Sequence, residues 1–135
     1  MRDLMLNDEV RIKSADTAAT LAFSAKDGDY FIASYESPAL RASIRVYGYT
    51  DCEALVELFE SMSRDWKGWE GERNWVSLEG EFGFSCTSDG KGHVALKLGF
   101  AQMYDPEPWR AQSTLNLEAG LLDSVATSVR KLFFG

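Results

Sequence analysis

The chain has 135 residues, 45% of them hydrophobic and 13% aromatic, so a single domain over residues 1–135 with a well-supplied core is expected. Its net charge is −7 without a cluster of basic residues, which argues against binding to nucleic acid or an anionic membrane, because both require a cationic surface. No apolar run approaches the roughly 18 residues that span a bilayer, and Met1 to Glu9 lack the hydrophobic stretch of a signal peptide, so a cytoplasmic protein is expected.

The first half of the chain predicts four strands. Apolar side chains alternate with polar ones in these segments, and polar turns separate them. Between the second and third strands, Lys26-Asp27-Gly28-Asp29 has the composition of a hairpin turn. The predicted strands cover residues 10–13, 19–25, 30–35 and 40–47.

The best-marked helix is predicted at residues 51–65. Thr50 and Glu53 have the spacing of a capping box, and Gly68 is placed to end the last turn. On the outer face, Glu60 is expected to pair with Arg64. The buried stripe of this helix is predicted to contain Leu55, Val56, Phe59, Met62 and Trp66.

The second half returns to alternation with a period of two. One strand is predicted to run from Val76 through Glu79 and Glu81 to Cys86, followed by strands at 93–100 and 109–117 and a helix from about Ala119. The order β-β-β-β-α-β-β-β-α predicts an α+β fold. We expect one antiparallel sheet of about seven strands, with its apolar face covered by the two helices.

Residues that could support catalysis or metal binding are sparse. His93 is the only histidine, and Cys52 and Cys86 lack the close spacing of a zinc or redox site, so both are interpreted as buried hydrophobes rather than a disulfide. Glu79 and Glu81 would share one face of a regular strand, but an acidic solvent-facing surface is favoured over a catalytic pair. The sequence therefore predicts no catalytic residue, no metal site and no cofactor.

Three of the four tryptophans fall in residues 66–75, among glycines and charged residues. This composition predicts a compact turn between the helix and the next strand. Trp66 and Trp75 are expected in the core, and Trp69 is expected to be partly exposed and available as a contact residue. Arg73 is expected to pair with Glu72 or with Glu79 nearby. The predicted core consists of Phe59, Trp66, Trp75, Phe82, Leu96 and Phe133.

The run from Trp66 to Gly80 carries the motif Trp-x-Gly-Trp-x-Gly-Glu-Arg-x-Trp-x-Ser-Leu-Glu-Gly, followed by Asp89-Gly90 and a strand at residues 92–96. Over residues 50–133 this pattern resembles a small bacterial family described only as a domain of unknown function. The resemblance implies an α+β domain of about this size and little about activity. In size and acidity the chain is also similar to immunity proteins of bacterial toxin systems, a likeness of general character without a motif.

The negative charge is concentrated in residues 51–81, where nine acidic and three basic residues give a local balance of −6, while the other 104 residues carry −1. Such a surface serves solubility in many proteins, but it also suits a basic protein partner. The leading hypothesis is a non-enzymatic protein-binding domain, an immunity protein that covers the basic active site of a toxin. Its predicted binding residues are Glu53, Glu57, Glu60, Trp69, Glu70 and Glu72.

Two other functions remain open. A small-molecule-binding or enzymatic domain would place a pocket between the sheet and the tryptophan turn, and a deep aromatic pocket would favour it over a flat acidic face. A self-associating domain would use an uncovered sheet edge. The sequence predicts neither the identity of the partner nor the oligomeric state.

Overall fold

In the computed structural model, which describes residues 8–104 and 106–135, eight strands, two α-helices and one short 3-10 helix form the fold. The elements are β1 (Glu9–Lys13), β2 (Thr20–Asp27), β3 (Tyr30–Glu36), β4 (Arg41–Tyr47), α2 (Asp51–Arg64), β5 (Arg73–Val76), β6 (Phe82–Ser88), β7 (His93–Gln102), β8 (Trp109–Glu118), η1 (Ala119–Leu121) and α3 (Leu122–Phe134).

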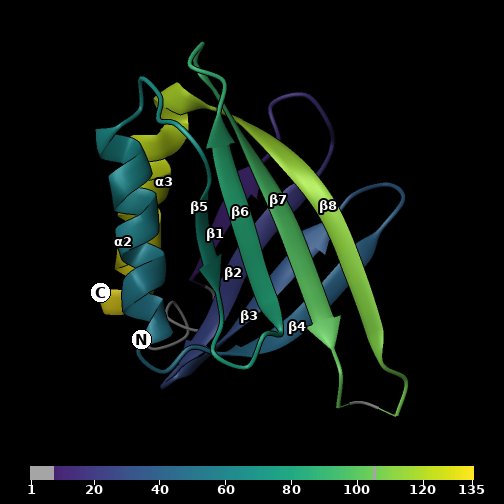
Figure 1. The fold of residues 1–135 in the computed structure, drawn as a ribbon. Coiled ribbons are helices and arrows are strands. Elements are labelled where there is room, and N and C mark those ends of the chain that lie inside the picture. The colour runs from purple at the N-terminus through teal and green to yellow at the C-terminus, as the bar shows by residue number, and fades with distance from the viewer. Residues whose placement is uncertain (1–7, 105) are drawn as a thin grey trace.

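The strands form two antiparallel sheets, β1-β2-β3-β4 and β5-β6-β7-β8, each in chain order. Figure 1 shows the second sheet in front of the first, with both helices along one side. The α+β class and the antiparallel pairing are confirmed. The expectation of a single sheet of about seven strands is wrong, because each sheet buries its own apolar face and the two faces share one core.

The eighth strand arises because the chain reverses between β5 and β6. Ser77 is 2% exposed; its N–H donates to the carbonyl of Phe82 at 2.9 Å, and its hydroxyl bonds to the carboxylate of Glu81. Gly80 has φ +77°, a conformation that glycine adopts without steric cost. Glu79 and Glu81 therefore lie in a turn and not on one face of a regular strand.

The two helices close one open side between the sheets. α2 contacts β5, α3 contacts β1, and the helices contact each other. Phe23 of β2 lies near the centre of the core, with its ring centroid 5.7–6.4 Å from four other phenylalanine rings. These rings belong to Phe31 of β3, Phe59 of α2, Phe82 of β6 and Phe133 of α3. Both sheets and both helices thus meet around one side chain.

The predicted core is confirmed except at one position. Phe59, Trp75, Phe82, Leu96 and Phe133 are buried in one cluster. The prediction for Trp66 is wrong, since this side chain is 52% exposed. The reason is that α2 ends at Arg64, so the residue lies beyond the last helical turn and leaves the buried stripe.

The N-terminal end of α2 also differs in detail from the expected capping box. The N-cap residue Thr50 makes no side-chain capping hydrogen bond, and its backbone oxygen accepts a hydrogen bond from the N–H of Glu53 at 3.2 Å. Asp51 instead anchors the helix start, because its Oδ2 accepts the N–H of Leu78 at 2.7 Å and its carbonyl accepts the indole N–H of Trp75 at 2.9 Å.

The turn between β1 and β2 lies against the outer edge of β8. Ala15 donates its N–H to the carbonyl of Asn116 at 2.7 Å, Asn116 donates its N–H to Ser14 Oγ at 3.2 Å, and its side-chain amide donates to Asp16 at 2.9 Å.

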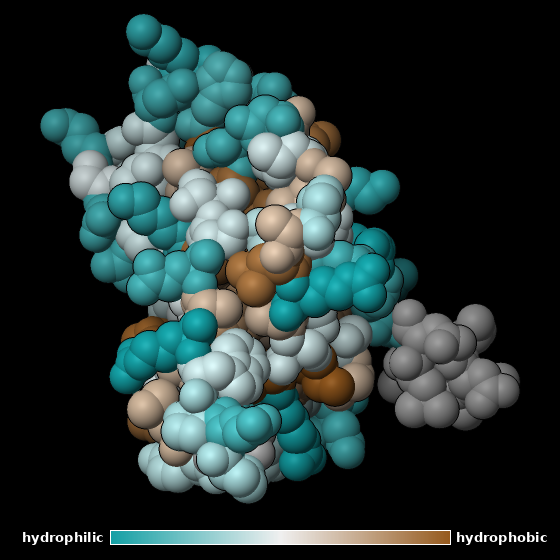
Figure 2. Space-filling view, turned by 90° about the vertical axis from the view of Figure 1, so that its right-hand side faces the viewer, coloured by the Kyte–Doolittle hydropathy of each residue, from teal (hydrophilic) through white to brown (hydrophobic). Residues whose placement is uncertain are grey.

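Figure 2 views the side of the molecule on which β8 lies, and its brown atoms form separate spots among white and teal ones. This side therefore shows no broad hydrophobic surface.

Cys52 and Cys86 are buried and free, and burial raises the pKa of the Cys86 thiol to about 12. Both behave as the small hydrophobes that the sequence predicts. Among the described residues, no helix is long and apolar enough to cross a membrane. The prediction about a signal peptide falls largely on residues 1–7, which lie outside the described part of the chain.

Candidate functional site

The predicted acidic residues lie along α2 and in the loop that follows it. Glu53 and Glu57 are exposed on the helix, and Glu70 and Glu72 are exposed in the loop at its C-terminal end. Because α2 has 14 residues, with a rise of 1.5 Å each, these carboxylates are distributed over roughly 20 Å. None of the four forms a salt bridge with a residue in the described part of the chain. We call this set the acidic ridge.

Glu60 differs from the acidic ridge because its carboxylate is already engaged. Arg130 of α3 donates two hydrogen bonds to it, from Nε at 2.5 Å and from Nη2 at 3.0 Å. These hydrogen bonds hold the pKa of Glu60 below its ordinary value. The pairing of Glu60 with Arg64 that the sequence predicts does not form. Glu60 therefore joins the two helices.

Three other acids of residues 51–81 have internal partners as well. Asp51 accepts the N–H of Leu78, and Glu81 accepts the N–H of Tyr47 at 3.1 Å. Asp65 accepts a hydrogen bond from Arg73 at 2.7 Å. Part of the negative charge that the sequence concentrates in this region therefore organises the fold, and the carboxylates of the acidic ridge and of Glu79 form no salt bridge among the described residues.

In the tryptophan turn, Trp69 is partly exposed as predicted, and Trp66, which was expected in the core, is the more exposed ring. Trp69 is partly buried, donates its indole N–H to the carbonyl of Cys86 at 3.4 Å, and is covered by the Arg73 guanidinium, 4.7 Å from its ring centroid. Trp66 is the exposed tryptophan of this turn. Arg73 also donates to Ser61 at 3.1 Å, so it pins the turn to α2, and the predicted pairing with Glu72 or Glu79 does not form.

His93 lies at the start of β7 in an exposed acidic environment. Its Nδ1 is 2.8 Å from Asp89 Oδ2, and its Nε2 is 3.7 Å from Glu118 Oε2. The hydrogen bond to Asp89 and the two negative charges raise the pKa of His93. Within residues 8–104 and 106–135, no three His, Cys, Asp or Glu side chains are grouped so that they could hold a metal ion.

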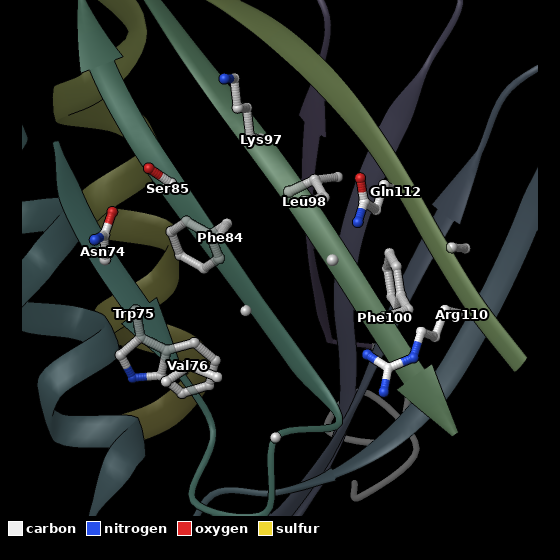
Figure 3. Close-up of a pocket in the computed structure, with 14 residues that line it drawn as sticks. Asn74, Trp75, Val76, Phe84, Ser85, Lys97, Leu98, Phe100, Arg110 and Gln112 are labelled. Atoms are coloured by element: carbon white, nitrogen blue, oxygen red, sulfur yellow. The ribbon is translucent and has the colours of Figure 1, made fainter. Parts of the chain in front are cut away.

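An open trough of about 530 Å³ lies on the outer face of the second sheet. Strands β5 to β8 all contribute to it, and Trp75 of the tryptophan segment is part of its lining. Figure 3 shows Lys97 and Arg110 toward opposite ends of the trough, with Gln112 between them. Among residues 8–104 and 106–135, no Asp or Glu side chain lines the trough, in contrast to the acidic ridge.

Two paired glycines form the middle of the trough. Gly83 of β6 lies opposite Gly99 of β7, which in turn lies opposite Gln112 of β8. A Cβ atom built on Gly99 would meet nothing within 4 Å, so the space above this backbone is empty. A Cβ on Gly83 would lie 2.8 Å from the carbonyl oxygen of Trp75, so this glycine is needed for the close approach of β5.

Residues 11–135 match the model of a family of unknown function, DUF6228. The chain belongs to this family. No curated protein and no solved structure matches the chain. The family membership extends over both sheets and both helices, and it assigns no activity to any of the residues above.

The trough was not apparent from the sequence, although part of its signal is present there. Lys97 and Gly99 alternate with buried side chains along one predicted strand, and Arg110 and Gln112 alternate with partly buried ones along another. The pairing register places these four residues on one face of the sheet. Periodicity identifies the exposed face of each strand but not which strands are neighbours, so it could not bring the two cations together.

Proposed function

We propose that this member of the DUF6228 family is a non-enzymatic protein-binding domain, and that its acidic ridge receives a basic protein partner. The observation that carries the proposal is that Glu53, Glu57, Glu70 and Glu72 are exposed without a salt bridge among the described residues, whereas their neighbours Glu60 and Asp65 are paired. Like charges on one helix repel each other, and a basic surface would relieve this repulsion on binding.

The exposed ring of Trp66 supports the same proposal. It lies in the turn that joins α2 to the loop bearing Glu70 and Glu72. Binding energy at protein interfaces is concentrated in aromatic side chains, and tryptophan is the most enriched of them. An exposed ring four residues before Glu70 would add an apolar contact to the electrostatic steering by the ridge. Trp66 therefore replaces Trp69 as the proposed aromatic contact.

Within this class we propose a bacterial toxin with a basic active site as the partner, so that the domain would act as an immunity protein. The support is the charge complementarity alone. The other function considered, small-molecule binding beside the tryptophan turn, has less support, because ligand pockets usually enclose most of a small ligand and the trough is open.

The test uses a quadruple variant, Glu53→Gln, Glu57→Gln, Glu70→Gln and Glu72→Gln. After the partner has been captured from the source organism and purified, association and dissociation rates are measured at low and at physiological salt. The variant should fold normally and should associate on the order of tenfold more slowly at low salt, since exposed charges act mainly on the association rate.

The matched control changes the net charge by the same amount elsewhere on the surface. Asp27→Asn, Asp29→Asn, Glu79→Gln and Glu107→Gln alter four exposed acids outside the acidic ridge. The control should bind at the rate of the unmodified protein. A partner that binds the ridge variant at an unchanged and salt-independent rate would refute the proposal.

A further inference from the structure

We infer that the trough on the outer face of the second sheet binds an extended acidic peptide segment of a protein partner, independently of the acidic ridge. Lys97 and Arg110 are part of its lining, and no carboxylate of the described residues is. Neither cation forms a salt bridge within the described residues. In a chain of net charge −7, this is a cationic surface without a neutralising acid among the described residues.

The spacing of the two cations fits an extended peptide. Lys97 lies opposite Thr114 on β8, and Arg110 is four residues from Thr114 on the same strand. At about 3.3 Å per residue, this places the two basic positions roughly 13 Å apart along the sheet. A peptide in extended conformation presents residues i and i+4 on one side at the same separation. Acidic side chains at these two positions would therefore reach both cations.

The space between the cations suits a main chain better than a compact molecule. Gly99 lies between Lys97 and Ala101 on the same face of β7, and the space above it is empty. Gln112, opposite Gly99, offers an amide donor and acceptor to peptide groups. The trough is open along its length, whereas small-molecule sites enclose most of their ligand.

Ser85 provides an independent observation at the same place. Ser85 of β6 lies opposite Lys97 of β7 and lines the trough. Its hydroxyl is inaccessible to solvent and has no hydrogen-bond partner in the described part of the chain. A buried polar group without a partner is costly, so a peptide that displaces the atoms covering this hydroxyl and accepts its hydrogen bond would remove that cost.

The test uses a defined probe, an acetylated and amidated peptide that contains Glu-Thr-Val-Thr-Glu, with backbone amide NMR of the full chain as the readout. At about 1 mM peptide, chemical-shift changes are expected at Gly83, Ser85, Gly99 and Gln112. The same peptide with Lys in place of both Glu should cause none. The double variant Lys97→Gln and Arg110→Gln should weaken binding at least tenfold and remove most of its salt dependence.

Gly99→Val fills the trough and is expected to abolish binding. The fold should tolerate it, because its Cβ meets no other atom and β-branched residues favour strands. The control is Ala95→Val, which introduces the same valine side chain on the same face of β7 outside the lining of the trough and should bind normally.

Three results would overturn the inference. The first is the absence of localised shifts at the trough, or shifts that persist in Gly99→Val. The second is that inorganic phosphate or free glutarate reproduces the shifts, since the trough would then be an anion site only. The third is that the same amides shift with protein concentration in the absence of peptide, because a second copy of the chain would then be the occupant. None of these results bears on the acidic ridge, so the two proposals fail separately.

Discussion

Tyr35 of β3 and Ser113 of β8 join the two sheets through a hydrogen bond of 2.6 Å between their hydroxyl groups. Tyr35 is 4% exposed, so its hydroxyl depends on this partner. Tyr35→Phe keeps the ring and removes the hydrogen bond. It should lower the free energy of unfolding by about 1 kcal/mol, measured by urea denaturation.

The double variant of Tyr35→Phe and Ser113→Ala tests whether this loss belongs to the pair. If the two hydroxyl groups act through each other, the double variant should lose less stability than the sum of the two single variants, by roughly 0.5–1.5 kcal/mol. Strictly additive losses would show that the hydrogen bond does not couple the two sheets.

Truncation of Trp75 should lower the free energy of unfolding far more than truncation of Trp66. Trp75 is 6% exposed and donates its indole N–H to the carbonyl of Asp51, so Trp75→Ala should cost about 3–5 kcal/mol of unfolding free energy. Trp66→Ala should cost less than about 0.5 kcal/mol, because the ring is half exposed. Guanidinium denaturation of both variants is the measurement. A loss under about 1 kcal/mol for Trp75→Ala would contradict its place in the core.

The interaction between His93 and Asp89 predicts a pH dependence that can be followed at one ring, because the chain contains a single histidine. The hydrogen bond to Asp89 raises the pKa of His93, so an NMR titration should give a value above the ordinary 6.5. The stabilisation is fully present below the pKa of the unfolded chain and is lost as the pH rises through the pKa of the folded protein.

Asp89→Asn is the control for this titration. The pKa of His93 should fall in this variant but stay slightly raised, because the carboxylate of Glu118 remains 3.7 Å from Nε2. Thermal melts of both proteins should differ most at acidic pH, above the range in which Asp89 itself is protonated. An unchanged histidine titration in Asp89→Asn would exclude this carboxylate as the cause of the shift.

Removal of metal ions should leave the stability of the protein unchanged. The described residues offer no group of three potential ligands, and the fold rests on one continuous hydrophobic core. The melting temperature should therefore be the same before and after treatment with a chelator. If a stoichiometric metal were lost and the melting temperature fell, Glu72, Glu79, Glu81 and His93 would be the first residues to substitute.

Most of the elements follow from the sequence because their signals are local. Alternation defines the strands, and the spacing of Leu55, Phe59 and Met62 defines the buried face of α2. The fifth and sixth strands could not be separated in this way, because the reversal at Ser77 depends on its hydrogen bonds to Glu81 and Phe82. Period-two alternation continues on both sides of such a turn and hides it.

The sequence does not predict which side chains from distant segments contact each other. Glu60 has Arg64 in reach along its own helix, yet the chain brings Arg130 to it from α3. Trp66 continues the helical spacing of the core, but α2 ends at Arg64, so the ring lies outside the helix and is exposed. Trp69 then fills the place against Cys86. The end of the helix was predicted to within one residue, and the error was to extend the buried stripe past it to Trp66.

The contact between Ser14 and Asn116 also determines when the first turn can be covered during folding. About a hundred residues separate the two partners, so the first hairpin leaves the ribosome long before the strand that covers its turn exists. We expect the N-terminal sheet to remain incompletely protected against amide hydrogen exchange until β8 has docked. A chain released before residue 109 would then leave its first turn uncovered and would be a substrate for proteases, whatever the quality of its own hairpins.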